Sequence, residues 1–209
     1  ASIPDLLDRA QRAENERLHR LQQRLAQPLP KLTLIRNVRW FDSRAAVPRG
    51  PSDVYVVHGR VVAMTAPDAL AGVPDAVVEG AGRMLLPGLF DMHGHVAWGA
   101  SGLFHLLGGV TSVRDMGSDN DALNDTRTGI ARGEIAGPRI HPTGFIEGRS
   151  PYSAGMGFVV DDLAAARRAV DWYAARGYRQ IKLYNSIRPD WVPPLVAHIK
   201  SRGLRVSGH

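Results

Sequence analysis

The sequence predicts an α/β protein in which a short β-rich segment precedes a longer region of alternating strands and helices. Hydrophobic residues make up 44% of the 209 residues, which is enough for a packed core. Residues 31–82 carry hairpin and turn signals, whereas apolar strands and amphipathic helices alternate over residues 83–209. Residues 1–30 are expected to form an amphipathic helix and a linker. Three regions are therefore predicted, and the middle one is part of a small β-sandwich or a single β-layer.

The first region is predicted to be helical over residues 3–27. Leucine and alanine recur there near the spacing of an amphipathic helix. Pro28 and Pro30 follow, and because proline cannot continue a helix, the helix is expected to end before them.

The middle region is predicted to contain short strands. Residues 32–41 form the first, and residues 53–64 form a hairpin that turns at His58 and Gly59. Residues 77–79 form a third short strand. We interpret His58 as a surface residue of the turn.

The last region is predicted to hold five strands, four of them followed by a helix. The strands are 85–95, 110–116, 139–146, 180–184 and 205–209. The helices are 100–107, 120–132, 161–176 and 190–202. Asp161 and Asp162 are candidate N-caps of the third of these helices. This alternation is typical of a parallel α/β architecture.

Composition narrows the class of protein and of site. Because there is no cysteine, any metal would need histidine, carboxylate or a modified side chain as ligand. No apolar run approaches the roughly 20 residues of a membrane span. The net charge of +6 arises from 23 arginines and 3 lysines scattered through the chain. They are not interleaved with aromatic residues, which argues against a nucleic-acid surface.

A His-x-His motif ends the first strand of the last region. Side chains alternate between the two faces of a strand, so Asp91, His93 and His95 are expected to point the same way. Two imidazoles on one face can chelate a divalent ion. The alternative is a half-exposed strand that happens to carry two histidines, and the motif alone does not separate the two.

Lys182 lies inside the apolar strand 180–184, where a bare ammonium group is unfavourable. A partner carboxylate would stabilise the charge. Alternatively, a lowered pKa would let the amine react with carbon dioxide to give a carbamate, an oxygen ligand that can bridge two metals. Arginine could not replace it, because the guanidinium stays protonated. A third interpretation is a lysine whose stem follows the protein wall while its head reaches water.

Three of the five predicted strand ends therefore carry groups that can bind metal: His93 and His95 on the first, Lys182 on the fourth and His209 on the fifth. Barrel-type α/β enzymes place their catalytic side chains at these ends of the strands.

These segments, in this order, resemble the metal-dependent amidohydrolase superfamily, and within it the imidazolonepropionase- and prolidase-like branch. The similarity extends over residues 32–209 and is carried by four motifs. They are Pro87-Gly88-Leu89-Phe90-Asp91-Met92-His93-Gly94-His95, Gly109-Val110-Thr111-Ser112-Val113-Arg114-Asp115, Ile181-Lys182-Leu183-Tyr184 and Val206-Ser207-Gly208-His209.

The resemblance implies a (β/α)8 barrel, of which this chain would supply about the first five βα units, beside a β-sandwich built from both chain ends. It also implies two divalent metal ions, most often zinc. His93 and His95 would bind the more buried ion. Lys182, carboxylated by carbon dioxide, would bridge both ions, and His209 would bind the second. Lys182 and His209 would thus be catalytic, with a metal-activated water as the nucleophile.

The implied reaction is hydrolysis of an amide-type C–N bond in a small molecule or short peptide, such as a dipeptide, an N-acyl amino acid or a cyclic amide. The family also uses a histidine after the sixth strand and an aspartate after the eighth. We expect the remaining strands to come from a C-terminal continuation or a partner chain, a homo-oligomer included, and the present chain alone to be inactive. The alternative is a non-catalytic metal-binding scaffold that needs such a partner to complete its site.

Two aspartates are candidates for supporting the metal ligands. Asp91 shares a face with both motif histidines, and Asp115 ends the second strand at the same rim. Each is expected either to orient a ligand through a hydrogen bond or to serve the strand end structurally.

Three residues are candidates for binding the substrate. Tyr184 is two residues beyond Lys182 on the same face, where it would hydrogen bond the substrate or simply pack. Arg149 and Tyr152 belong to a loop, residues 144–152, that is expected over the barrel mouth. They would bind a substrate carboxylate or be solvated as ordinary loop residues.

Overall fold

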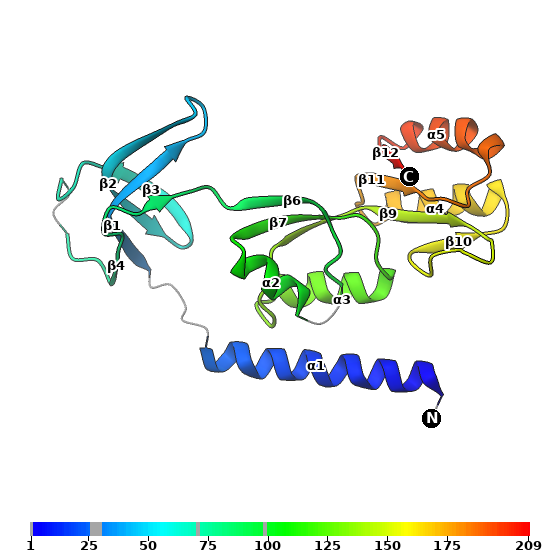
Figure 1. Ribbon diagram of the computed structural model, residues 1–209, viewed down its shortest axis with the longest axis horizontal. Coiled ribbons are helices and arrows are strands. Elements are labelled where there is room, and N and C mark those ends of the chain that lie inside the picture. Colours follow the sequence, from blue (N-terminus) through cyan, green and yellow to red (C-terminus); the bar gives the residue numbers. More distant parts are fainter. Residues whose placement is uncertain (1, 26–30, 70–71, 98–99) are drawn as a thin grey trace. The chain divides into compact units, whose positions relative to one another are not determined.

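The computed structural model describes residues 2–25, 31–69, 72–97 and 100–209. The chain divides into two compact units, one of residues 1–24 and 88–209 and the other of residues 25–87 (Figure 1). The predicted end of the first helix at Pro28 and Pro30 lies outside the described residues.

The unit of residues 25–87 is a single mixed sheet built around its longest strands. In the order β3-β2-β1-β4, with β5 also paired to β1, only the pairs β1–β2 and β2–β3 are antiparallel. The strands are β1 (Leu32–Asp42), β2 (Val47–Val57), β3 (Arg60–Thr65), β4 (Ala76–Glu79) and β5 (Met84–Leu85). A second sheet that would make a sandwich is not formed by the described residues of this unit.

The predicted hairpin turn is confirmed. His58 and Gly59 lie between β2 and β3 with φ angles of 47° and 71°, the left-handed conformation that a tight hairpin turn requires. Asp53, which is 1% exposed, holds the interior of this unit together by accepting hydrogen bonds from the amides of Asn37 (2.9 Å) and Asp68 (3.0 Å). The turn signals of the sequence therefore locate the hairpin, but not this buried carboxylate.

The other unit has an α/β fold with only parallel strand pairs. One sheet has the order β6-β7-β8, and the other has the order β10-β9-β11-β12. The strands are β6 (Leu89–Gly94), β7 (Val110–Asp115), β8 (Arg139–Pro142), β9 (Gly144–Gly148), β10 (Phe158–Val160), β11 (Gln180–Leu183) and β12 (Arg205–Gly208).

The predicted third strand, residues 139–146, is divided into two. Its first part, β8, pairs with β7, and its second part, β9, pairs with β11 and β10. The break falls at Thr143, whose amide donates to the Asp115 carbonyl at 2.9 Å. Because β8 and β9 follow each other directly, the five predicted strands lie side by side in sequence order. They do not close into a barrel within the described residues, and β10 was not predicted.

Four helices follow strands of this unit, as predicted. They are α2 (Ser101–Leu107), α3 (Asn120–Ala131), α4 (Leu163–Ala175) and α5 (Val192–Ser201), the last preceded by the 3-10 turn η1 (Pro189–Trp191). Asp162 is the N-cap of α4, since its side chain accepts a hydrogen bond from Ala165 N at 2.6 Å. Buried side chains of α4 and α5 pack with those of β9 and β11 in the largest core cluster.

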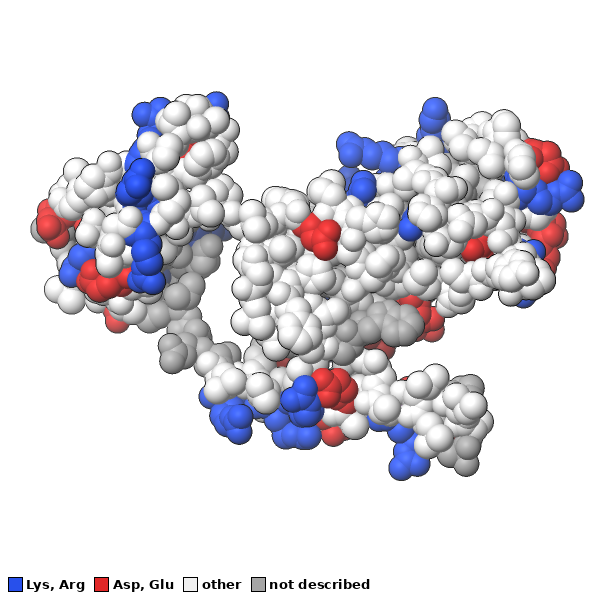
Figure 2. Space-filling model, in the orientation of Figure 1, with Lys and Arg blue, Asp and Glu red and all other residues white. Residues whose placement is uncertain are grey.

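Helix α1 (Ile3–Leu25) carries paired charges on its surface. Arg12 pairs with Asp8 and Arg17 with Glu14, and Figure 2 shows basic and acidic side chains next to each other along this helix. Gln22 donates to the Gly133 carbonyl at 2.7 Å, which ties the helix to the turn after α3. Among the described residues, no helix is long and apolar enough to cross a membrane.

Candidate metal centre

The two motif histidines lie together at the end of β6. Their ring centroids are 5.8 Å apart, and both residues are exposed. The strand itself ends at Gly94, where its register with β7 is irregular, so His95 lies just beyond regular structure. The amide of His93 donates to Asp91 Oδ1 at 2.8 Å.

One ring nitrogen of His95 is held by the backbone. Its Nδ1 is 2.5 Å from the carbonyl oxygen of Gly117. A carbonyl oxygen can only accept, so Nδ1 carries a hydrogen, and in the neutral ring the lone pair is then on Nε2. This is the tautomer that a metal ligand needs, and the hydrogen bond also sets the orientation of the ring.

Asp115 supports this arrangement from β7. It is fully buried, and its carboxylate accepts hydrogen bonds from Val96 N (2.9 Å), Gly117 N (3.1 Å) and the Ser118 hydroxyl (2.9 Å). Val96 directly follows His95, and Gly117 supplies the carbonyl that holds the His95 ring. Asp115 therefore holds both the residue that follows His95 and the residue whose carbonyl orients the His95 ring.

Lys182 is buried in β11 with 4% of its surface exposed. Its Nζ lies 4.9 Å from the ring centroid of Tyr184 and 5.7 Å from that of Phe145. It forms no ion pair within the part of the chain that the structure describes. Burial lowers the pKa of Lys182, and the charge of Asp115 opposes that shift. A carboxylate paired with Lys182, which is one of the three interpretations that the sequence allows, is therefore not found among the described residues.

His209 lies against the same tyrosine. Its ring stacks on Tyr184 with centroids 4.9 Å apart and planes inclined by 16°. Its Nδ1 is 3.1 Å from Asn185 Oδ1, an acceptor, so in the neutral ring the lone pair is again on Nε2. Tyr184 thus contacts both Lys182 and His209.

The four predicted ligands influence one another electrostatically. Burial and the positive charges of Lys182 and His95, followed by those of Arg114 and His209, lower the pKa of His93. A lower pKa favours the neutral imidazole, the form that binds metal. The side chains are nevertheless not drawn together: no group of three or more His, Cys, Asp or Glu residues that could hold a metal occurs among the described residues.

The other predicted residues are placed as follows. Besides the His93 amide, Asp91 binds the ring of His105 on α2, with Oδ2 3.0 Å from Nε2. Arg149 forms an exposed ion pair with Asp161. Tyr152 is 91% exposed.

Sequence reasoning missed two residues here. His105 was given no role, and nothing in its local pattern predicts that it reaches Asp91. Glu147 is fully buried at the end of β9, where it accepts hydrogen bonds from the amides of Ser186 (2.7 Å), Gly148 (3.1 Å) and Ala154 (3.4 Å). It thereby ties together the loops after β9 and β11. An acidic residue within an otherwise apolar strand was the signal that could have revealed it.

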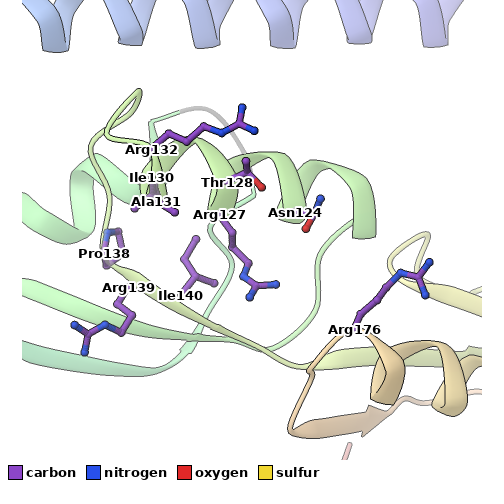
Figure 3. Close-up of a pocket in the computed structure, with 10 residues that line it drawn as sticks. All are labelled: Asn124, Arg127, Thr128, Ile130, Ala131, Arg132, Pro138, Arg139, Ile140 and Arg176. Atoms are coloured by element: carbon purple, nitrogen blue, oxygen red, sulfur yellow. The ribbon is translucent and has the colours of Figure 1, made fainter.

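The hollow shown in Figure 3 is not this site. It has a volume of about 730 Å³ and lies between α3, β8 and the end of α4, with none of the predicted ligands in its lining. Four arginines line it, but Arg132 and Arg176 are the C-caps of α3 and α4, where a positive charge complements the helix dipole. The arginine side chains diverge rather than converge on one point (Figure 3).

Comparisons with known proteins concern the sequence and the fold of this chain. No family model matches the chain. A dihydroorotase from Thermus aquaticus is 30% identical over 142 residues, which covers 60% of this chain and 32% of that protein. This sequence similarity covers less than half of that protein, and it agrees with the resemblance to the amidohydrolase superfamily.

Solved structures share the fold of this chain. A Bifidobacterium longum protein described as a prolidase matches 87% of this chain and 50% of its own, with a TM-score of 0.71 and 19% identity. A bottromycin amidohydrolase matches 94% of this chain and 41% of its own, with a TM-score of 0.68 and 23% identity. A Xaa-Pro dipeptidase matches 85% and 56%, with a TM-score of 0.66 and 19% identity. The chain spans about half the length of these proteins.

Proposed function

We propose that this chain forms part of a metal-dependent hydrolase that cleaves an amide-type C–N bond in a dipeptide, an N-acyl amino acid or a cyclic amide. Lys182 carries the proposal: a lysine in a buried strand, with a lowered pKa and no ion pair among the described residues, is an amine available for carboxylation. The similar proteins described as prolidase, dipeptidase and dihydroorotase support this reaction class.

The chemistry of the donor set suits two divalent ions such as zinc. His95 and His209 keep Nε2 available, His93 has a lowered pKa, and carboxylated Lys182 would supply oxygen to both ions. When bound, the ions would lower the pKa of a water molecule and polarise the scissile carbonyl.

The chain's own residues would prepare this site. Asp115 and the Gly117 carbonyl orient the His95 ring, and the aromatic ring of Tyr184 keeps Lys182 and His209 on one face. Tyr184 is also the best placed of the three candidate residues to meet a substrate. Arg149 would have to exchange its partner Asp161 for a substrate carboxylate.

We further propose that the remaining strands of a (β/α)8 barrel come from a C-terminal continuation or from another chain. The fold similarity, which covers about half of each related structure, supports this. So do the apolar side chains that β6 and α2 expose: Leu89, Phe90, Met92, Phe104 and Leu107. The same added segment would supply further strands to the β-sandwich.

The test compares two lysine variants in the natural full-length protein. Lys182→Ala is expected to lose at least one metal ion and to lower hydrolysis by at least about 100-fold, because a shared ligand is removed. Lys200→Ala, at an exposed position of α5, should change neither. Metal content is measured by elemental analysis, and hydrolysis on a panel of dipeptides, N-acyl amino acids and cyclic amides.

Three outcomes discriminate between the alternatives. Full metal content and activity in Lys182→Ala would show that the lysine is not a ligand. A wild-type protein that binds metal but hydrolyses none of the panel would favour the non-catalytic scaffold. Loss of metal and activity in Lys182→Ala alone supports the hydrolase.

A further inference from the structure

The turn that carries the metal motif has a hydrogen-bonded support on its helix side. His105 of α2 bridges two acceptors, with Nδ1 2.7 Å from the Ser101 carbonyl oxygen and Nε2 3.0 Å from Asp91 Oδ2. The other oxygen of Asp91 accepts the amide hydrogen of His93 at 2.8 Å. A continuous chain of hydrogen bonds therefore runs from α2 to the backbone of a predicted ligand.

Both ring nitrogens of His105 face groups that can only accept a hydrogen bond. The ring of His105 is therefore held at both nitrogens, at one end by its own helix and at the other by the Asp91 carboxylate. Asp91 is the acceptor between the two segments, with Oδ1 receiving the His93 amide hydrogen and Oδ2 facing His105 Nε2.

Close packing at Gly94 independently places this pair against the motif. A Cβ atom built on Gly94 would lie 2.7 Å from Val113 Cγ1, 3.0 Å from Asp91 Oδ2 and 3.3 Å from His105 Nε2. The Asp91–His105 pair thus lies directly under the glycine between the two motif histidines. A displacement of the Asp91 carboxylate would therefore displace this turn, because closely packed atoms transmit small movements.

We infer that His105 is a positioning residue that holds the Asp91 carboxylate on the His93 amide and so fixes the turn that presents His93 and His95 to metal. This inference rests on the proposed function. It complements the role of Asp115, which fixes the chain beyond His95 from the opposite neighbour, β7.

The chain offers a matched control for a purely structural histidine–aspartate pair. His198 of α5 binds Asp171 of α4 with Nε2 2.9 Å from Oδ1. The side chains of that pair are 20% and 42% exposed, close to the 18% and 33% of His105 and Asp91. Both pairs join two elements, but only Asp91 lies in the strand that carries the motif.

The experiment compares His105→Phe with His198→Phe in the natural full-length protein. Zinc affinity, measured by competition with a chelator, should fall by about 10- to 100-fold in His105→Phe, the usual effect of removing a group that orients a ligand. His198→Phe should retain the wild-type affinity, even if its unfolding temperature falls as far as that of His105→Phe. In the background of Asp91→Asn, His105→Phe should have no further effect, because it acts through that carboxylate.

A second measurement does not depend on metal. In the metal-free protein the amide of His93 should exchange its hydrogen faster in His105→Phe than in the wild type, and at the wild-type rate in His198→Phe. Unchanged zinc affinity and unchanged exchange in His105→Phe would overturn the inference while leaving the hydrolase proposal intact. If the wild-type protein binds no zinc, the proposed function fails, and the exchange rate of the His93 amide then decides the role of His105 by itself.

Discussion

Strands β6 and β11 both carry predicted metal ligands, but their surroundings differ. β11 pairs with β9 on one edge and β12 on the other, and three of its four residues are buried. β6 pairs with β7 alone among the described strands, and four of its six residues are exposed. The strand of Lys182 is thus paired along both edges within this chain. The strand that leads to His93 and His95 is paired along one edge and, among the described strands, unpaired along the other.

The largest expected effect tests this comparison through stability. Ile181 of β11 is fully buried, so Ile181→Ala should lower the free energy of unfolding of the 209-residue chain by about 2–5 kcal/mol. Phe90 of β6 is 65% exposed, so Phe90→Ala should change it by less than about 0.5 kcal/mol. Urea unfolding of both variants measures the difference.

The same two variants in a natural protein with further strands sharpen the comparison. If additional segments cover the face of β6 that bears Phe90, Phe90→Ala should there become destabilising by about 3 kcal/mol, while Ile181→Ala keeps its effect. A Phe90→Ala effect that stays near zero in the longer protein would show that this side of β6 is not covered.

The edge of β6 that pairs with β7 can be tested at Asp115. Asp115→Ala would leave three hydrogen-bond donors without their acceptor in a buried site, and should lower the free energy of unfolding by about 1–3 kcal/mol. Asp91→Ala, at a side chain that is 33% exposed, should have a smaller effect because water can replace the lost acceptor. Equal effects of the two variants would show that the contacts of this turn with β7 stabilise the protein no more than its contacts with α2.

The sequence predicted strands, helices and the hairpin well where a local signal exists. His58 and Gly59 specify a left-handed turn, and Asp162 specifies a helix start, so both follow from neighbouring residues alone. The division of the predicted third strand at Thr143 could not be predicted, because it depends on which strands are available as partners.

The candidate site shows the same limit. Alternation along a strand places His93 and His95 near each other, and an apolar strand predicts that Lys182 is buried. The partners of these residues come from distant segments: His95 binds the Gly117 carbonyl, and Asp91 binds His105. Such contacts depend on tertiary packing, for which one sequence carries no local pattern.

The smallest expected effect is the change of the free energy of unfolding with pH that arises from His93 on β6. The pKa of His93 in the folded protein is lowered below 6.5, first by burial and then by the neighbouring positive charges. Below that folded pKa both states of the protein bind the proton, and the folded state bears the full unfavourable energy of the charged ring. As pH rises through the window up to 6.5, the unfolded state binds more protons than the folded state, so the free energy of unfolding of the metal-free protein should increase.

The difference in urea midpoint between the wild type and His93→Gln, measured at pH 5 and at pH 7.5, isolates this contribution. Because the residue is exposed, the increase should be small and should shrink in high salt. In a longer protein that covers β6 the increase should be larger, and a contribution of equal size in both proteins would contradict the contrast between the two strands.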